Sequence, residues 1–221
     1  MKKSTMVILL ALAVILIAAG VVVGGAFGWS YSPVSGEYAV LLQDDTGSIT
    51  SIRVELLSCS IRVYTGWDDE LSAEGSGLGA VQVSAARNGS ELVLTESAPT
   101  GLRRYISTDR YNDYVVLWLP ENFAGELTLS TVSGETTLSS LQYPGTRAAI
   151  TTVSGELDVY DSSLDTLSVE SVSGDIWINA IVANRVSVHT VSGDIFGVAD
   201  GYDEPIEVDV NSVSGDIHFD Y

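Results

Sequence analysis

Apolar and polar residues alternate along most of the chain after residue 36, with the period of two that is typical of half-buried β-strands. In residues 125–221 this alternation recurs around one four-residue word, Val-Ser-Gly followed by Glu or Asp. The five words begin at Val132, Val153, Val172, Val191 and Val213, so their separations are 21, 19, 19 and 22 residues. A constant glycine at a period near 20 residues predicts a stack of similar units.

The positions around each word predict the shape of the unit. Apolar residues stand five and three residues before the valine and, in most copies, four and six residues after it; a Ser or Thr directly precedes every valine. The apolar phase changes at the valine, so the chain must bend or bulge there. We expect the word's glycine to supply the backbone freedom for this corner. These glycines are Gly134, Gly155, Gly174, Gly193 and Gly215.

Two short strands around a corner, repeated in this way, predict an all-β fold: a single-stranded parallel β-solenoid (β-helix) whose coils stack at about 4.8 Å. The alternative is an antiparallel meander, which would show turn signals about every 8–12 residues and opposite faces in successive strands. Like residues recur here at the full period, which favours the solenoid over residues 125–221.

The preceding region has no regular period but is also rich in β patterns. We interpret residues 45–124 as an irregular β lead-in or cap of the solenoid. An Asn-Gly pair at Asn88 and Gly89 is a strong hairpin signal. Strands are expected at 52–57, 59–64, 81–86, 91–96 and 114–120, with a short strand at 70–74 inside a loop.

The N-terminal segment is expected to lie in a membrane. Residues 7–29 carry no charge and would span about 34 Å as a helix, which is enough to cross a bilayer. Lys2 and Lys3 precede them, so residues 1–6 are predicted to be cytoplasmic and the body extracytoplasmic, with 30–44 as a linker. The alternative is a cleavable signal peptide cut at Phe27.

The charge balance excludes one class of partner. The chain has 10 basic and 29 acidic residues, a net charge of −19, and its only lysines are Lys2 and Lys3. A nucleic-acid backbone would be repelled by this field. The single cysteine, Cys59, excludes an intramolecular disulfide framework and is predicted to point into the core. The acid excess also suggests a salt-rich medium.

Stacked coils would align the acidic residue of every word in one row. Neighbouring carboxylates would repel by about 1 kcal/mol per pair even in water. Either the side chains lie in solvent and accept hydrogen bonds from turn amides, or the row holds divalent cations such as Ca²⁺. No other cofactor is expected. The row comprises Glu135, Glu156, Asp175, Asp194 and Asp216.

The residues that could support catalysis are few. His189 and His218 are both expected to point outward, and two histidines without a third partner do not indicate a zinc site or a catalytic triad. Trp177 lies between Ile176 and Ile178, faces outward, and is the strongest candidate for a ligand contact. We therefore expect no enzyme, with a polysaccharide-active β-helix enzyme as a remote alternative.

The lead-in IRVELLSCSIRVYTG, the Asn-Gly hairpin, the VVLWLP strand and the serial VSG[DE] words together resemble the putative adhesin family of bacterial and archaeal envelope proteins. This family consists of domains of unknown function built from SGD-type β-strand repeats. The resemblance covers about residues 45–221 and implies a β-solenoid, often behind a membrane segment. It supplies no catalytic residues.

These observations predict a single-pass membrane protein with a non-catalytic, adhesin-like surface module outside the membrane. Its partner would be a glycan or an envelope protein. The alternative is a structural or regulatory scaffold that self-associates or acts with a membrane partner.

Overall fold

The computed structural model describes residues 39–44, 49–66, 69–76, 82–97 and 113–221. The predicted membrane segment and its linker up to residue 38 lie outside them. Within the described residues the regular elements are all strands, which confirms the all-β prediction. None of these residues forms a helix long and apolar enough to cross a membrane.

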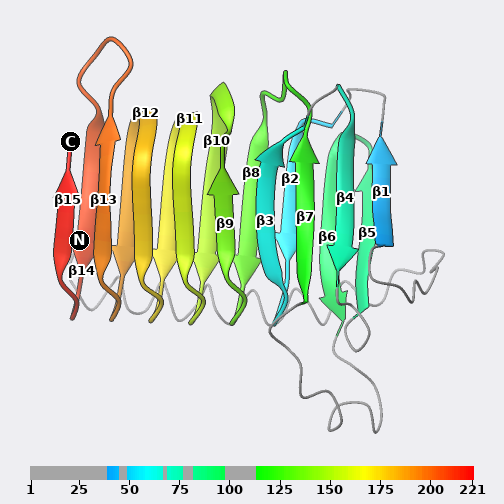
Figure 1. The fold of residues 1–221 in the computed structure, drawn as a ribbon, viewed down its shortest axis with the longest axis horizontal. Coiled ribbons are helices and arrows are strands. Elements are labelled where there is room, and N and C mark those ends of the chain that lie inside the picture. The colour runs from blue at the N-terminus through cyan, green and yellow to red at the C-terminus, as the bar shows by residue number, and fades with distance from the viewer. Residues whose placement is uncertain (1–38, 45–48, 67–68, 77–81, 98–112) are drawn as a thin grey trace, which may run out of the picture.

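The described residues form fifteen strands that are stacked in layers along the long axis, with β1 near one end and β15 at the other (Figure 1). Their bounds are β1 Ala39–Asp44, β2 Ser51–Glu55, β3 Ser60–Thr65, β4 Leu71–Ser76, β5 Gln82–Asn88, β6 Glu91–Ser97, β7 Tyr114–Leu119, β8 Glu126–Thr131, β9 Thr136–Ser139, β10 Gln142–Thr152, β11 Leu157–Ser171, β12 Ile176–Thr190, β13 Ile195–Asp200, β14 Glu207–Ser212 and β15 Ile217–Asp220.

The repeat region forms parallel rungs at the spacing of the words. On the side before the Val-Ser-Gly corner, β8, β10, β11, β12 and β14 pair in parallel, so that Leu127, Ala148, Leu167, Val186 and Val208 share one row. On the side after the corner, β9 pairs with the start of β11, then β12, β13 and β15 follow. We call these the pre-corner side and the post-corner side. Like positions therefore stack on like positions.

Each coil has a third side that the sequence pattern did not reveal. β11 and β12 bend after their first four residues at Asp161 and Ala180, which have positive φ of 50° and 54°. Ser140 makes the same bend after β9 with φ 58°. The prediction of two short strands per coil was therefore incomplete. β11 and β12 each continue from the post-corner side, around this bend, to the next pre-corner side.

The lead-in is more regular than predicted at its centre and more mixed at its edge. β2 and β3 form a coil that pairs in parallel with β8 and β9 on one flank and with β6 and β7 on the other. Beyond them β1, β4 and β5 pair antiparallel with their neighbours. This end is therefore a mixed sheet, which is consistent with the predicted irregular lead-in, and the hairpin at Asn88 and Gly89 is confirmed.

One continuous core runs through the stack. The apolar residues at alternate positions are almost completely inaccessible, as in Leu157, Val159, Leu167 and Val169 of β11. Cys59 belongs to this core, as predicted. The outward side chains of the pre-corner side and of the post-corner side can therefore differ without affecting the core.

Candidate functional site

The glycine of each corner is required by close packing and not by an unusual backbone angle. A Cβ on Gly155 would lie 1.9 Å from the carbonyl oxygen of Gly134, and a Cβ on Gly174 would lie 1.9 Å from that of Gly155. Gly89 is the glycine with positive φ among the described residues. The residues predicted for the corners are thus correct, but the predicted reason, backbone freedom, is wrong.

Hydroxyl groups satisfy a backbone amide inside three of the corners, whereas Thr190 Oγ1 at the Gly193 corner has no hydrogen-bond partner among the described residues. The amide of Gly155 donates to Thr152 Oγ1 at 3.0 Å, and Gly134 and Gly174 make the same bond to Thr131 and Ser171. The serine of the word also bonds along the stack: Ser154 Oγ donates to the carbonyl of Val132 at 3.1 Å. The conserved spacing of Ser, Thr and Gly within the repeat therefore has a structural purpose.

Two members of the acidic row, Asp175 and Asp194, accept a hydrogen bond from the backbone of the next coil. Asp194 donates its amide to Asp175 Oδ1, and Asp216 donates its amide to Asp194 Oδ1, both at 2.9 Å. The five side chains line up as predicted, and each is exposed or half-buried. The described residues include no group of three or more His, Cys, Asp or Glu placed to hold a metal. Binding of Ca²⁺ by this row stays a prediction.

A sixth corner, hidden in the sequence, belongs to the β2–β3 coil. Cys59 takes the place of the glycine, because its carbonyl oxygen lies 1.9 Å from where a Cβ on Gly134 would be. The buried carboxylate of Glu96 accepts bonds from the amides of Leu57, Ser58 and Cys59 at 2.7, 2.8 and 3.1 Å. Burial, with the nearby charges of Glu96 and Asp113, raises the pKa of the Cys59 thiol, which disfavours its thiolate form at neutral pH.

The outer surface of the pre-corner side is charged and internally paired. Arg147 contacts Glu126 at 2.8 Å, Arg185 contacts Glu207 at 2.5 Å, and these pairs join neighbouring strands. Exposed pairs of this kind contribute little to stability. Their consequence is that neither arginine is left to balance charge elsewhere.

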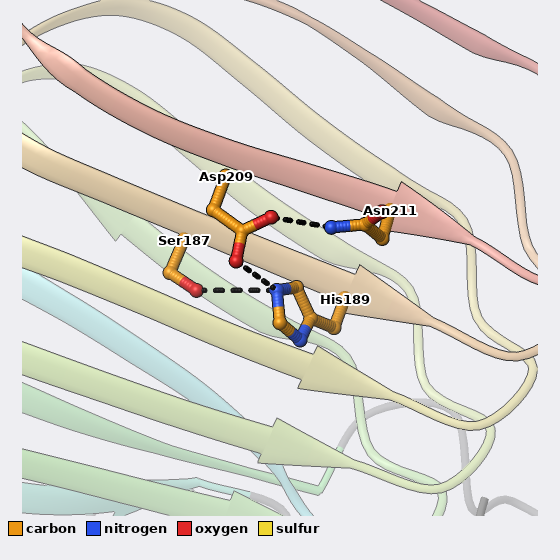
Figure 2. Close-up of polar contacts among 4 residues, drawn as sticks. All are labelled: Ser187, His189, Asp209 and Asn211. Atoms are coloured by element: carbon orange, nitrogen blue, oxygen red, sulfur yellow. Dashed lines mark hydrogen bonds and ion pairs between the residues drawn. The ribbon is translucent and has the colours of Figure 1, made fainter. Parts of the chain in front are cut away.

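His189 lies in a polar cluster on the same side (Figure 2). Its Nε2 is 3.4 Å from Ser187 Oγ and 3.2 Å from Asp209 Oδ2, and Asp209 also accepts a hydrogen bond from Asn211. In a catalytic Ser-His-Asp relay the serine and the aspartate contact different ring nitrogens. Here both contact Nε2, so the cluster joins β12 to β14 and does not form such a relay.

The post-corner side instead carries a row of rings. Trp177 on β12 stacks on Phe196 of β13 with centroids 4.3 Å apart, and Phe196 stacks on His218 of β15 at 5.4 Å. Trp177 is 45 % exposed, and Tyr160 nearby on β11 is 37 % exposed. Trp177 and His218 thus point outward as predicted. The row itself was missed, because its three members lie in different coils and only the register brings them together.

Asp158 precedes Trp177 in the same row, as its register partner on β11. Burial raises the pKa of this half-buried carboxyl, and the charges of Glu156 and Glu135 raise it further. Among the described residues no hydrogen bond or ion pair to its carboxylate is present.

Two hollows on the described surface lie away from the ring row. One, of about 330 Å³, lies between Ile49, Leu71, Pro120 and Phe123. The other, of about 300 Å³, lies at the β14–β15 end between Val208, Val210, Ile217 and Phe219. Neither hollow contains His189, Trp177 or Asp158.

The geometry defines a class of domain: an all-β stack of repeated coils with chemically different outer sides. Residues 142–221 match the model of the Toastrack DUF4097 family, which confirms the resemblance to a repeat domain of unknown function. The crystal structure of a putative cell adhesion protein from Clostridium sporogenes is similar to this chain at 13 % identity, with a TM-score of 0.38. It covers 83 % of this chain and 98 % of its own, and this level of similarity supports no argument about function. No curated protein matches the chain.

Proposed function

We propose that this chain is a membrane-anchored, extracytoplasmic β-solenoid that acts as a non-catalytic, adhesin-like surface-binding module. The observation that carries the proposal is the ring row of Trp177, Phe196 and His218, in which Trp177 and His218 are exposed and Phe196 is half-buried. Exposed aromatic groups that no other part of the fold covers are typical of interaction sites. Residues 7–29 support the anchor through their length and lack of charge.

Two observations support a non-catalytic role. The His189 cluster lacks the two-nitrogen geometry of a relay. The acidic residues of the words form a uniform row in place of one carboxylate pair facing a groove. A polysaccharide-active enzyme would require such a pair.

Binding of the purified, labelled full-length protein to isolated cell envelopes tests the proposal. We expect saturable binding that Trp177→Ala weakens, with Tyr143→Phe, a change inside the core, as a control. Tyr143 is 2 % exposed and its hydroxyl donates to the Leu119 carbonyl, so its loss does not alter the ring row. Absence of saturable binding by the wild-type protein would contradict the proposal.

The second candidate is a scaffold that self-associates through the β14–β15 end. Ile217 is 44 % exposed there, and Val208, Val210 and Phe219 of the same end are only partly covered. Light scattering of the full-length protein over a range of concentrations tests this candidate. Growth of the particle mass with concentration that Ile217→Lys abolishes would favour the scaffold over the binding module.

A further inference from the structure

The repeat region as a whole has a strong and unbalanced negative charge. From residue 131 to residue 221 the sequence contains fifteen Asp or Glu residues and two arginines, Arg147 and Arg185. Both arginines lie on the pre-corner side, each in contact with a glutamate. The acidic row and Asp158 therefore have no Lys or Arg of this region near them on the post-corner side, where the rings lie.

The other half of the same side shows how a cation is accommodated on this surface. Arg62 on β3 places its guanidinium 4.5 Å from the centroid of the Tyr114 ring on β7. A cation over an aromatic face is attracted by the ring quadrupole. Arg62, Thr137, Asp158 and Trp177 occupy one row of register partners across four strands. Both halves of the side hold rings, but among the described residues the β3–β7 half also holds an arginine, whereas the β11–β13 half holds carboxylates.

Asp158 and Trp177 form the part of this half that is most suited to a cation. β12 lies between β13 and β11, so Phe196 stacks on Trp177 from one flank and Asp158 is its neighbour on the other. A half-buried carboxylate without a partner, beside Glu156 and Glu135, is electrostatically unfavourable. An incoming cation would relieve this repulsion. A neutral glycan would leave it uncompensated, and a polyanion would increase it.

We propose that the post-corner surface of β11, β12 and β13 binds a basic polypeptide segment. One lysine or arginine of the segment lies against Trp177 and Asp158, as Arg62 lies against Tyr114, and its other basic side chains face the acidic row at Asp175 and Asp194. This inference rests on the proposed surface-binding function and identifies the chemistry of the partner.

Titration of full-length protein with hexalysine by calorimetry tests the inference. We expect Trp177→Ala to weaken binding about fivefold, as loss of a cation–π contact does, and Trp177→Phe to restore most of the affinity. Asp158→Asn is expected to weaken binding about threefold, whereas Glu170→Gln changes it less than about twofold. Glu170→Gln is the matched control, because this substitution also removes one negative charge from β11, but on the pre-corner side. Circular dichroism verifies that each variant is folded.

Three outcomes would overturn the inference. The first is that Trp177→Ala binds hexalysine as tightly as the wild type. The second is that Glu170→Gln weakens binding as much as Asp158→Asn, which would show that hexalysine is held by long-range attraction and not by a local site. In the envelope assay, saturable binding that a neutral linear oligosaccharide displaces and hexalysine does not would identify a glycan as the occupant. That third result leaves the proposed function intact, whereas the absence of any envelope binding contradicts the proposed function itself.

Discussion

The corner glycines leave no room for a side chain between neighbouring coils. Gly174→Ala would place a methyl group 1.9 Å from the Gly155 carbonyl oxygen, and this oxygen is backbone that cannot move without disturbing the rungs. We expect a loss of about 3 kcal/mol in the free energy of unfolding, measured by urea titration. Gly145→Ala is the control, because its methyl group would lie at an ordinary 3.6 Å from Ala124. Equal effects of the two substitutions would contradict this explanation.

Two buried threonines at similar depth should respond in opposite directions to the same substitution. The Oγ1 of Thr136 is buried and has no hydrogen-bond partner among the described residues, whereas that of Thr152 accepts the Gly155 amide. Thr136→Val should raise the free energy of unfolding by about 1 kcal/mol, and Thr152→Val should lower it by about as much or more. Urea titration of both variants measures these changes. A Thr152→Val variant more stable than the wild type would contradict a stabilising role for the bond between Thr152 Oγ1 and the Gly155 amide.

Asp158 should make the folded protein less stable as the pH rises through the acid range. Burial raises its pKa in the folded state above the ordinary 3.8, so the folded protein holds this proton more tightly than the unfolded chain does. Stability therefore falls as the pH rises from 3.8 through the folded-state pKa. Asp158→Asn should be more stable than the wild type at pH 7, and the difference should vanish below pH 3.8. Thermal unfolding at several pH values tests this, with Glu170→Gln as the control.

The sequence predicts Trp177 and the outward position of His218, but it points to neither Phe196 nor Asp158. Trp177 is identified from its place between two core isoleucines. Its stacking on Phe196 and the isolation of Asp158 depend on register across coils, and nothing local in the sequence encodes that register. The capping role of Glu96 is hidden for the same reason, since its partners lie 37 to 39 positions away.

The coil is the unit of the fold, and whole coils should be removable. Residues 153–171 run from one Val-Ser-Gly word to the residue before the next, so deleting them joins Thr152 to Val172 at equivalent positions. We expect a folded protein with one rung fewer and a lower melting temperature, because stacks of this kind are stabilised by neighbour contacts. Circular dichroism with a melting curve measures this.

The control for that deletion is removal of residues 153–162, which would shift the later rungs out of register and prevent folding. If the shorter deletion also folds, the rungs do not act as discrete units.

The sequence predicts the strands at 52–57 and 59–64, which correspond to β2 and β3, but it misses the corner between them and the bends of the later coils. The β2–β3 coil has Cys59 and Ser60 where the repeat has Gly and an acid, so its corner does not match the word. The bends at Ser140, Asp161 and Ala180 use positive φ without glycine or asparagine, the residues that usually mark such bends. Where alternation and a turn pair coincide, as in β5 and β6, prediction and structure agree.

The molecule as a whole should be sensitive to salt. Its net charge is −19, and repulsion between carboxylates is screened as the Debye length falls from about 10 Å at 0.1 M to about 3 Å at 1 M. We expect molar sodium chloride to raise the melting temperature by about 3 °C or more, which corresponds to about 1 kcal/mol at this size. An uncharged osmolyte at equal osmolality is the control, and an unchanged melting temperature in salt would contradict the expectation.

The position of the β2–β3 coil bears on how the chain acquires its structure during synthesis. This coil is the first to be synthesised with both of its sides, yet in the folded protein it lies inside the stack. It has β6 and β7 on one flank and β8 and β9 on the other. It can therefore act as a nucleus from which rungs are added in two directions. Substitutions at Ile52 or Ile61 should slow refolding, whereas substitutions at Val208 should mainly speed unfolding, because assembly reaches that rung last.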